Sequence, residues 1–165
     1  MIRRKKNRIA LSGVLNEEAD LSKLEIEASK IGEGSVLEVD MSEVPRANSH
    51  GVRLWLLALS KVDRAVVYVN CPVWLVYQFN AVHEFFSEEL FPHGVDVASF
   101  KAPFQCDSDT SVDLDLVVGE DVPILDSYEG YRLRAIKIGG KEYRAAFEPD
   151  LYFEFLTRID NDDEE

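Results

Sequence analysis

The stretch Asp40-Met41-Ser42-Glu43-Val44-Pro45-Arg46-Ala47-Asn48-Ser49-His50-Gly51-Val52 decides the fold of this chain. It follows a short apolar run at 35–39 and leads into an apolar segment that reaches Val62. That order predicts a strand, a polar loop and a helix. Loops that follow a strand and open a helix are favoured binding places in α/β sheets, because a helix N-terminus presents free N–H groups and partial positive charge. We therefore expect the working surface of the protein here.

The helix predicted after this loop is apolar around most of its circumference. Five of its apolar residues recur at helical spacing: Val52, Trp55, Leu56, Leu59 and Val62. Three more widen the apolar stripe: Leu54, Leu57 and Ala58. A helix this apolar packs on more than one side, so we expect it to contact its own sheet and also a neighbouring helix or a partner.

Strand and helix patterns alternate from residue 8 to residue 100. The periodicity predicts strands over 8–15, 35–39, 65–69 and 95–100. It predicts helices over 21–31, 52–62 and 73–86. This alternation is typical of an α/β layer in which helices flank a partly parallel sheet, which is the fold class we expect for a first domain at 1–98.

The pattern changes after Pro103. Strands are predicted over 112–116, 131–138 and 141–146, with Gly139-Gly140 as a hairpin turn, followed by a closing helix over 149–156. Around 60 residues with three short strands are near the lower size for independent folding. We therefore expect 99–165 to form a small, mostly β appendage that docks on the first domain.

Charge is abundant and unevenly placed. The 165 residues carry 31 acids and 18 bases, a formal net charge of −13, which argues against a general nucleic-acid binder with its clustered cations. The start, 3–8, is basic, whereas 102–131 contains acids but no Lys or Arg, and 160–165 is acidic. One interpretation is a frayed basic start and a solvating acidic tail. The other is that the basic start meets the acidic half, within one chain or across a dimer.

The sequence contains no recognisable catalytic or membrane signature. Its two cysteines, Cys71 and Cys106, do not make a disulfide framework, and no apolar run is long enough for a signal peptide or a membrane span. Phosphate-loop, dinucleotide-binding, zinc-protease and nucleophile-elbow motifs are absent from the sequence. No base stands beside Cys71, and the carboxylates offer no identifiable acid/base pair. We expect a cytoplasmic protein without enzymatic activity, cofactor or membrane contact.

Residues 8–98 resemble a STAS domain, the fold of bacterial anti-sigma-factor antagonists. Four segments carry the resemblance: the alternating strand 9–15, the strand and loop 36–44, the segment Asn48-Ser49-His50-Gly51-Val52, and the strand 65–70. The family implies a small sheet flanked by helices that acts by protein–protein contact. In the antagonists, a kinase-type anti-sigma factor phosphorylates the second Ser/Thr of that loop, and the phosphate disrupts binding.

The critical loop departs from the family pattern. His50 stands where the resemblance places the phosphorylated residue, and Asn48 stands where it places an Asp. A histidine at a helix N-terminus is disfavoured as a cation, so we expect His50 to be neutral. The usual serine switch is therefore not expected. Ser49 remains a candidate phosphorylation site, although Ser49 or Asn48 is also suited to cap the helix.

Residues 99–157 resemble the zinc ribbon that follows some bacterial STAS domains. The chain keeps Phe100-Lys101-Ala102-Pro103-Phe104-Gln105-Cys106, Gly139-Gly140 and the ending 148–156. The family's other cysteines are replaced by Asp109, Ala135 and Ile138. A structural zinc site needs four N or S ligands, so we expect a degenerate ribbon without bound zinc, in which Ala135 and Ile138 fill the former site by apolar packing.

These observations predict a non-enzymatic regulatory or scaffolding protein that binds through the loop and helix 45–62. The expected partner-binding residues are Arg46, Asn48, Ser49, His50, Gly51 and Arg53. The expected partner is a protein, either a kinase-type anti-sigma factor or signalling protein, or a second copy of the chain. The alternative is a small-ligand or nucleotide-sensing module that uses the helix N-terminus at 48–52.

Overall fold

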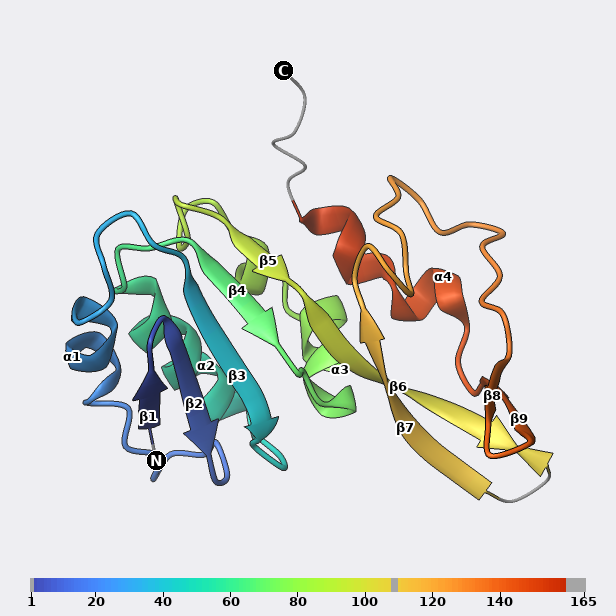
Figure 1. Ribbon diagram of the computed structural model, residues 1–165. Helices are drawn as coiled ribbons and strands as arrows, with labels where there is room; N and C mark the ends of the chain where they lie inside the picture. The colour runs from blue at the N-terminus through green and yellow to red at the C-terminus, as the bar shows by residue number, and fades with distance from the viewer. Residues whose placement is uncertain (1, 108–109, 160–165) are drawn as a thin grey trace.

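The computed structural model describes residues 2–107 and 110–159 and contains two sheets (Figure 1). The first sheet has the order β1-β2-β3-β4-β5, formed by Ile2–Lys5, Arg8–Ser12, Leu37–Glu43, Val66–Val69 and Val95–Val97. The second has the order β7-β6-β9-β8, formed by β6 Ser99–Cys106, β7 Thr110–Val117, β8 Ile136–Ile138 and β9 Lys141–Ala145. The helices are α1 Leu24–Ser29, α2 Ser49–Ser60, α3 Val73–Ala81, η1 His83–Phe86, α4 Pro149–Tyr152 and η3 Glu154–Arg158.

Strands β2, β3, β4 and β5 are parallel, and each is joined to the next through α1, α2 or α3. Right-handed crossovers that always step in one direction place every helix on the same face of the sheet. Figure 1 shows these three helices behind the first sheet and none in front of it. The expected α/β class with a partly parallel sheet is confirmed.

Alternating residues of the first sheet bury their side chains under these helices. Ile9 of β2, Leu37 and Val39 of β3 and Tyr68 of β4 are fully buried. Each buried side chain of this size contributes about 1.5–3 kcal/mol relative to an exposed one. The period-two pattern seen in the sequence is therefore the pattern of the face that the helices cover.

The basic N-terminus is a strand, and the expectation of a frayed start is wrong. β1 pairs antiparallel with β2 through a turn in which Lys6 has a φ of 55°. The cations of β1 meet acids of the first sheet and its helix, because Arg3 pairs with Glu43 and Arg4 pairs with Glu27 at 3.1 Å. Among the described residues, neither of these two arginines pairs with the acidic segment after Cys106. The acidic tail 160–165 lies outside the described residues.

The strand predicted over 95–100 is divided between the two sheets. Val95–Val97 pairs with β4, whereas Ser99 starts β6, and the N–H of Ala98 at the junction donates to the carbonyl of Tyr68. β6 stays beside the first sheet for two residues, since the Cys71 N–H donates to Ser99 O and the Lys101 N–H donates to Cys71 O. One extended run therefore serves both sheets.

The second sheet differs from prediction in two strands. The strand predicted to end at residue 100 continues as β6 to Cys106. Gly139 and Gly140 have φ values of 56° and 77° and form the expected hairpin turn between β8 and β9. The strand predicted over 131–138 pairs only over Ile136–Ile138. The apolar alternation shifts phase at the adjacent residues Ala135 and Ile136, so one strand cannot keep all of these side chains on one face.

The closing segment packs α3 against the second sheet. The helix predicted over 73–86 ends at Ala81 and is followed by η1, and the closing helix is divided into α4 and η3. Phe155 packs tilted against Phe79 and edge-to-face against Phe100, with ring centroids 5.5 and 5.2 Å apart. A single hydrophobic cluster runs through both sheets. In the described part of the chain, no helix is long and apolar enough to cross a membrane.

Candidate functional site

The N-terminus of α2 is capped by Asn48. The Asn48 side-chain oxygen accepts a hydrogen bond from the Gly51 N–H at 2.8 Å, and its amide group donates to the Glu17 carboxylate at 2.8 Å. The hydrogen bond from Asn48 is the main reason why the pKa of Glu17 is lowered. The sequence placed a cap at Asn48 or Ser49, and the structure assigns it to Asn48.

The loop before α2 is held from two sides. The backbone of Leu15 donates to Arg46 O at 3.1 Å and accepts from the Asn48 N–H at 3.0 Å, and the Trp74 indole N–H donates to Val44 O at 2.8 Å. β3 extends to Glu43, so the loop is shorter than the sequence suggested. These bonds fix the direction in which α2 leaves the sheet.

Gly51 is required by this close approach. A Cβ atom at Gly51 would lie 2.0 Å from the carbonyl oxygen of Leu15, which is far inside contact distance. Gly51 is also buried, so its place in the site is to let the loop and the helix meet. The remaining predicted site residues are exposed: Arg46, Asn48, Ser49, His50 and Arg53.

The exposed cations of this site have no internal partner. Among the described residues, no ion pair or side-chain hydrogen bond involves Arg46 or Arg53. His50 lies close enough to Glu17 to contribute a small lowering of its pKa. The chain has a net charge of −13, so exposed and unpaired arginines at a helix start form a local positive patch. An acidic surface on a partner would complement this patch.

A groove of about 530 Å³ lies beside these cations, between α2 and the end of α3. Ser49, Arg53 and Leu57 line one wall, and Val82 and Leu90 line the other. The expectation that α2 packs on more than one side holds in part, since α1 contacts α2 and yet Leu57 remains 47% exposed. Leu57 was part of the predicted apolar stripe, but the groove itself could not be read from α2 alone.

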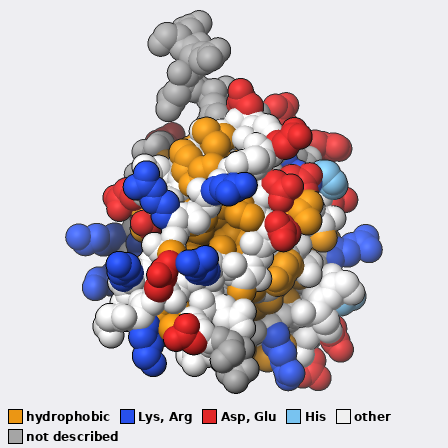
Figure 2. Space-filling view, turned by 90° about the vertical axis from the view of Figure 1, so that its right-hand side faces the viewer, with side chains coloured by type: hydrophobic (Ala, Val, Ile, Leu, Met, Phe, Trp, Pro, Cys, Tyr) orange, Lys and Arg blue, Asp and Glu red, His pale blue; other side chains and the backbone are white. Residues whose placement is uncertain are grey.

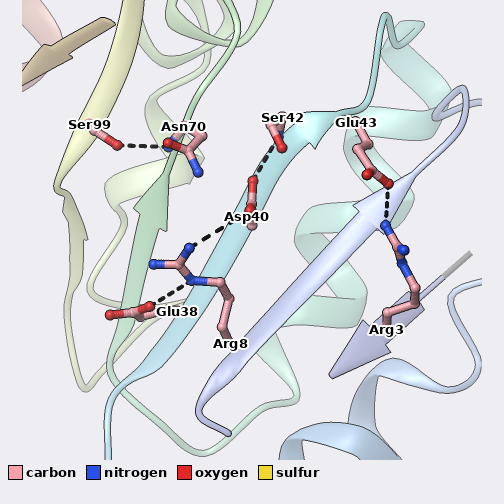
Figure 3. A network of polar contacts seen from close by, with 8 residues as sticks. All are labelled: Arg3, Arg8, Glu38, Asp40, Ser42, Glu43, Asn70 and Ser99. Atoms are coloured by element: carbon pink, nitrogen blue, oxygen red, sulfur yellow. Dashed lines mark hydrogen bonds and ion pairs between the residues drawn. The ribbon is translucent and has the colours of Figure 1, made fainter. Parts of the chain in front are cut away.

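Among residues 2–107 and 110–159, no helix covers the opposite face of the first sheet (Figure 1), and this face carries a ladder of charged side chains beside Ala10, Val67 and Val69. Figure 3 shows its side chains on the near side of the strands, with the helices behind. Arg8 bonds to Glu38 at 2.9 Å and lies 4.0 Å from Asp40. Parallel sheets are usually covered on both faces, so this bare face is uncommon. The charged side chains of this face pair with one another across the strands. They form a cross-strand ladder and not a catalytic acid/base pair.

Further polar contacts continue at the carboxyl ends of β3 and β4. The carboxylate of Asp40 accepts from the Ser42 N–H at 3.0 Å, and the Ser99 hydroxyl accepts from the Asn70 N–H at 2.8 Å (Figure 3). Cys71 follows Asn70 and is fully buried, and this burial raises the pKa of its thiol well above the ordinary value. A neutral buried thiol is a poor nucleophile and a poor metal ligand.

The expected remnant of a zinc site is not assembled as predicted. Cys106 is buried at the end of β6, but Ala135 is exposed and Ile138 is 47% exposed, so the prediction that these two residues fill a former site by apolar packing is wrong. Asp109 lies outside the described residues. Within the described part of the chain, no three His, Cys, Asp or Glu residues are grouped closely enough to hold a metal ion.

Comparison with models of known protein families finds no match, and comparisons with curated proteins and with solved structures find none either. The residues and geometry of the α2 surface are therefore the features from which a function is inferred.

Proposed function

We propose that the chain is a STAS-like, non-enzymatic regulatory or scaffolding protein that acts in the cytoplasm by binding another protein. The contact surface is the loop and helix 45–62, together with the groove beside α2. One observation carries the proposal: unpaired Arg53 and half-exposed Leu57 lie on the same wall of a groove at the start of a firmly anchored helix. Apolar anchors beside charged groups are what protein interfaces select.

The partner in this proposal presents a carboxylate next to an apolar side chain. The apolar side chain enters the groove against Leu57 and Val82, and the carboxylate meets Arg53. Arg46 extends the cationic border toward the loop, and His50 adds an exposed imidazole beside it. The resemblance to STAS domains suggests a kinase-type anti-sigma factor or another signalling protein as the partner class, with a second copy of the chain as the other candidate.

The contact is proposed to be constitutive and not switched by a phosphorylated serine. His50 occupies the position of the usual switch residue, and Ser49 is the only hydroxyl in the segment 48–52. Ser49 is exposed at the first position of α2, with Arg53 one turn later. A phosphate on Ser49 would place negative charge one helical turn from Arg53, where that arginine could pair with it, and would also meet the Glu17 carboxylate that Asn48 holds.

The geometry favours this proposal over a nucleotide-sensing site at 48–52. A phosphate bound at the α2 N-terminus would meet the Glu17 carboxylate, which is held 2.8 Å from the Asn48 amide. The Gly51 N–H already donates to Asn48, so one of the free donors that a phosphate uses is occupied. Screening nucleotides by thermal shift separates the two ideas, because a sensing site requires stabilisation by at least one of them.

Recovery of the partner with surface variants tests the proposal. The tagged full-length chain is used as bait, and His50→Glu, Arg53→Glu and Leu57→Asp are compared with wild type. Ile26→Asp is the matched control, because Ile26 is 58% exposed on α1, away from the groove. Loss of one specific partner with Arg53→Glu and Leu57→Asp, and its retention with Ile26→Asp, is the expected result. Equal recovery by all variants would refute this surface.

A further inference from the structure

The segment 131–135, which precedes β8, has the sequence pattern of a strand but does not pair with another described strand. Residues 131–135 alternate apolar and cationic side chains, yet the pairing of β8 with β9 stops at Ile136 and Tyr143. Within the described part of the chain, no backbone hydrogen bond involves Arg132, Leu133, Arg134 or Ala135. Their N–H and C=O groups are therefore free to pair with an added strand.

A groove of about 620 Å³ lies where this segment separates from β9. Residues 130–133 and Ala135 form one wall, and Arg144, Ala145 and Phe147 belong to the other. The separation has a physical cause, because Tyr131 is drawn toward the aromatic cluster, with its ring 5.6 Å from that of Tyr128. Figure 2 shows this side of the molecule, with hydrophobic side chains along the middle of the face and Lys and Arg side chains close by.

The charge of this segment is opposite to that of the whole chain. Residues 131–145 contain five cations and one acid, in a chain whose net charge is −13. The cations are all exposed: Arg132, Arg134, Lys137, Lys141 and Arg144. In the described residues, only Arg144 of these five forms an ion pair, with Glu142 at 3.2 Å. Of the four unpaired cations, Arg132 lines the groove and Arg134 lies in the same unpaired segment, so these two are available to an anionic partner.

We propose that this groove binds an extended segment of a partner protein that alternates acidic and apolar residues and pairs, as an added strand, with the backbone of 132–135. Addition of a strand to a free edge obtains affinity from main-chain hydrogen bonds and specificity from alternate side chains. The acidic side chains of the segment lie opposite Arg132 and Arg134, which share one face, and its apolar side chains lie over Leu133 and Phe147. This surface is separate from the α2 groove and does not depend on the function proposed there.

The groove chemistry favours a peptide over a nucleic acid. Glu142, Glu148 and Asp150 line the groove together with Arg132 and Arg144, so a continuous phosphate backbone would meet carboxylates as well as cations. An extended peptide can place carboxylates opposite the arginines and uncharged groups opposite the acids. The unpaired backbone donors and acceptors of 132–135 also match a peptide backbone, which supplies both in alternation.

Binding of a short peptide to the full-length chain tests this proposal. The probe is a capped peptide with the sequence of Thr110–Val117, because its Val112-Asp113-Leu114-Asp115-Leu116 has the required alternation. The matched peptide carries D113N and D115N. Fluorescence anisotropy measures affinity at low and high salt, and amide hydrogen exchange measures protection of 132–135. The protein variants are Arg132→Glu with Arg134→Glu, and the control is Lys23→Glu with Lys61→Glu, which changes charge equally elsewhere.

The expected result is salt-sensitive binding of the acidic peptide, with slowed exchange at 132–135. Charge reversal at Arg132 and Arg134 should weaken binding about tenfold or more, because each attraction becomes a repulsion, whereas the control double variant should bind as wild type does. Binding without protection of 132–135, equal binding of the asparagine peptide, or no binding would overturn the proposal. Self-association of the chain that is lost on the same charge reversal would overturn the assignment to a partner and identify a second copy instead.

Discussion

The backbone of Gly51 lies against the carbonyl group of Leu15, so closely that a Cβ atom at residue 51 would lie 2.0 Å from the Leu15 oxygen. This contact joins the loop after β2 to the start of α2, and both backbone hydrogen bonds of Leu15 go to the loop that carries the proposed interaction surface. The position of that surface therefore depends on the absence of one methyl group.

Gly51→Ala is expected to destabilise the protein by about 2 kcal/mol, because overpacking against a backbone atom outweighs the better helix propensity of alanine. Chemical denaturation measures this difference. Gly32→Ala is the matched control, since its Cβ would meet only the Ser35 hydroxyl oxygen at 3.3 Å. A Gly51→Ala protein as stable as the Gly32→Ala protein would mean that the loop does not pack on the helix in this way.

Local chemistry explains the parts of the fold that the sequence predicted. β4 was foreseen from its apolar run, because such runs form buried strands. The Asn48 cap and the Gly139-Gly140 turn were foreseen because each depends on a side chain or a backbone angle within a few residues. The same local reasoning placed Ser49, His50 and Arg53 together at the start of α2.

Contacts between distant segments explain what the sequence did not predict. The charged run Arg3-Arg4-Lys5 resembles a disordered start, but it pairs as a strand with β2, and its arginines find Glu27 and Glu43 within reach in the fold. The groove beside α2 needs Val82 and Leu90 from a later part of the chain. The unpaired segment 131–135 was predicted as a strand because periodicity reports which faces are apolar and does not report whether a partner strand is present.

Asn80 joins α3 to the closing segment. Its amide donates to Tyr152 O at 3.1 Å, and its side-chain oxygen accepts from the Phe155 N–H at 2.8 Å. Asn80→Leu leaves both backbone groups without this partner, and we expect the free energy of unfolding to fall by about 1–3 kcal/mol. Hydrogen exchange should also accelerate selectively over 149–158. Gln78→Leu is the control on the same helix, and similar exchange in the two variants would show that Asn80 does not hold the closing segment.

A buried hydrogen bond connects α2 to β4. The Trp55 indole N–H donates to the Tyr68 hydroxyl at 3.1 Å, and both residues are almost completely buried. Tyr68→Phe leaves the indole N–H without an acceptor in the core and should lower the free energy of unfolding by about 1–3 kcal/mol. The measurement is equilibrium unfolding followed by tryptophan fluorescence. Tyr77→Phe, at a residue that is 55% exposed, should leave stability nearly unchanged. Equal effects of the two substitutions would contradict the role of this bond.

Glu17 gives the α2 start a dependence on pH. Its pKa lies below the ordinary value of 4.5, chiefly because Asn48 donates a hydrogen bond to the carboxylate. A lowered folded-state pKa means that the contribution of Glu17 is complete above the unfolded-state pKa and is lost as pH falls through the folded-state value. Glu17→Gln should therefore unfold at a lower temperature than wild type near neutral pH, and the difference should narrow below pH 4.5. Glu18→Gln is the matched control. A difference in unfolding temperature between wild type and Glu17→Gln that widens in acid would contradict this role of Glu17.

The second region is expected to fold without a metal ion. Cys106 is 4% exposed at the end of β6, and the positions where a ribbon would supply further ligands hold Ala135 and Ile138, which cannot ligate. Treatment with a strong chelator should leave the thermal midpoint of the full chain unchanged, and metal analysis of the purified protein should find zinc far below one per chain. Cys106→Ala should cost only the packing of a small buried side chain, similar to Cys71→Ala. A chelator that lowers the midpoint of wild type but not of Cys106→Ala would show that the thiolate holds a metal, because only a ligand residue can create that difference.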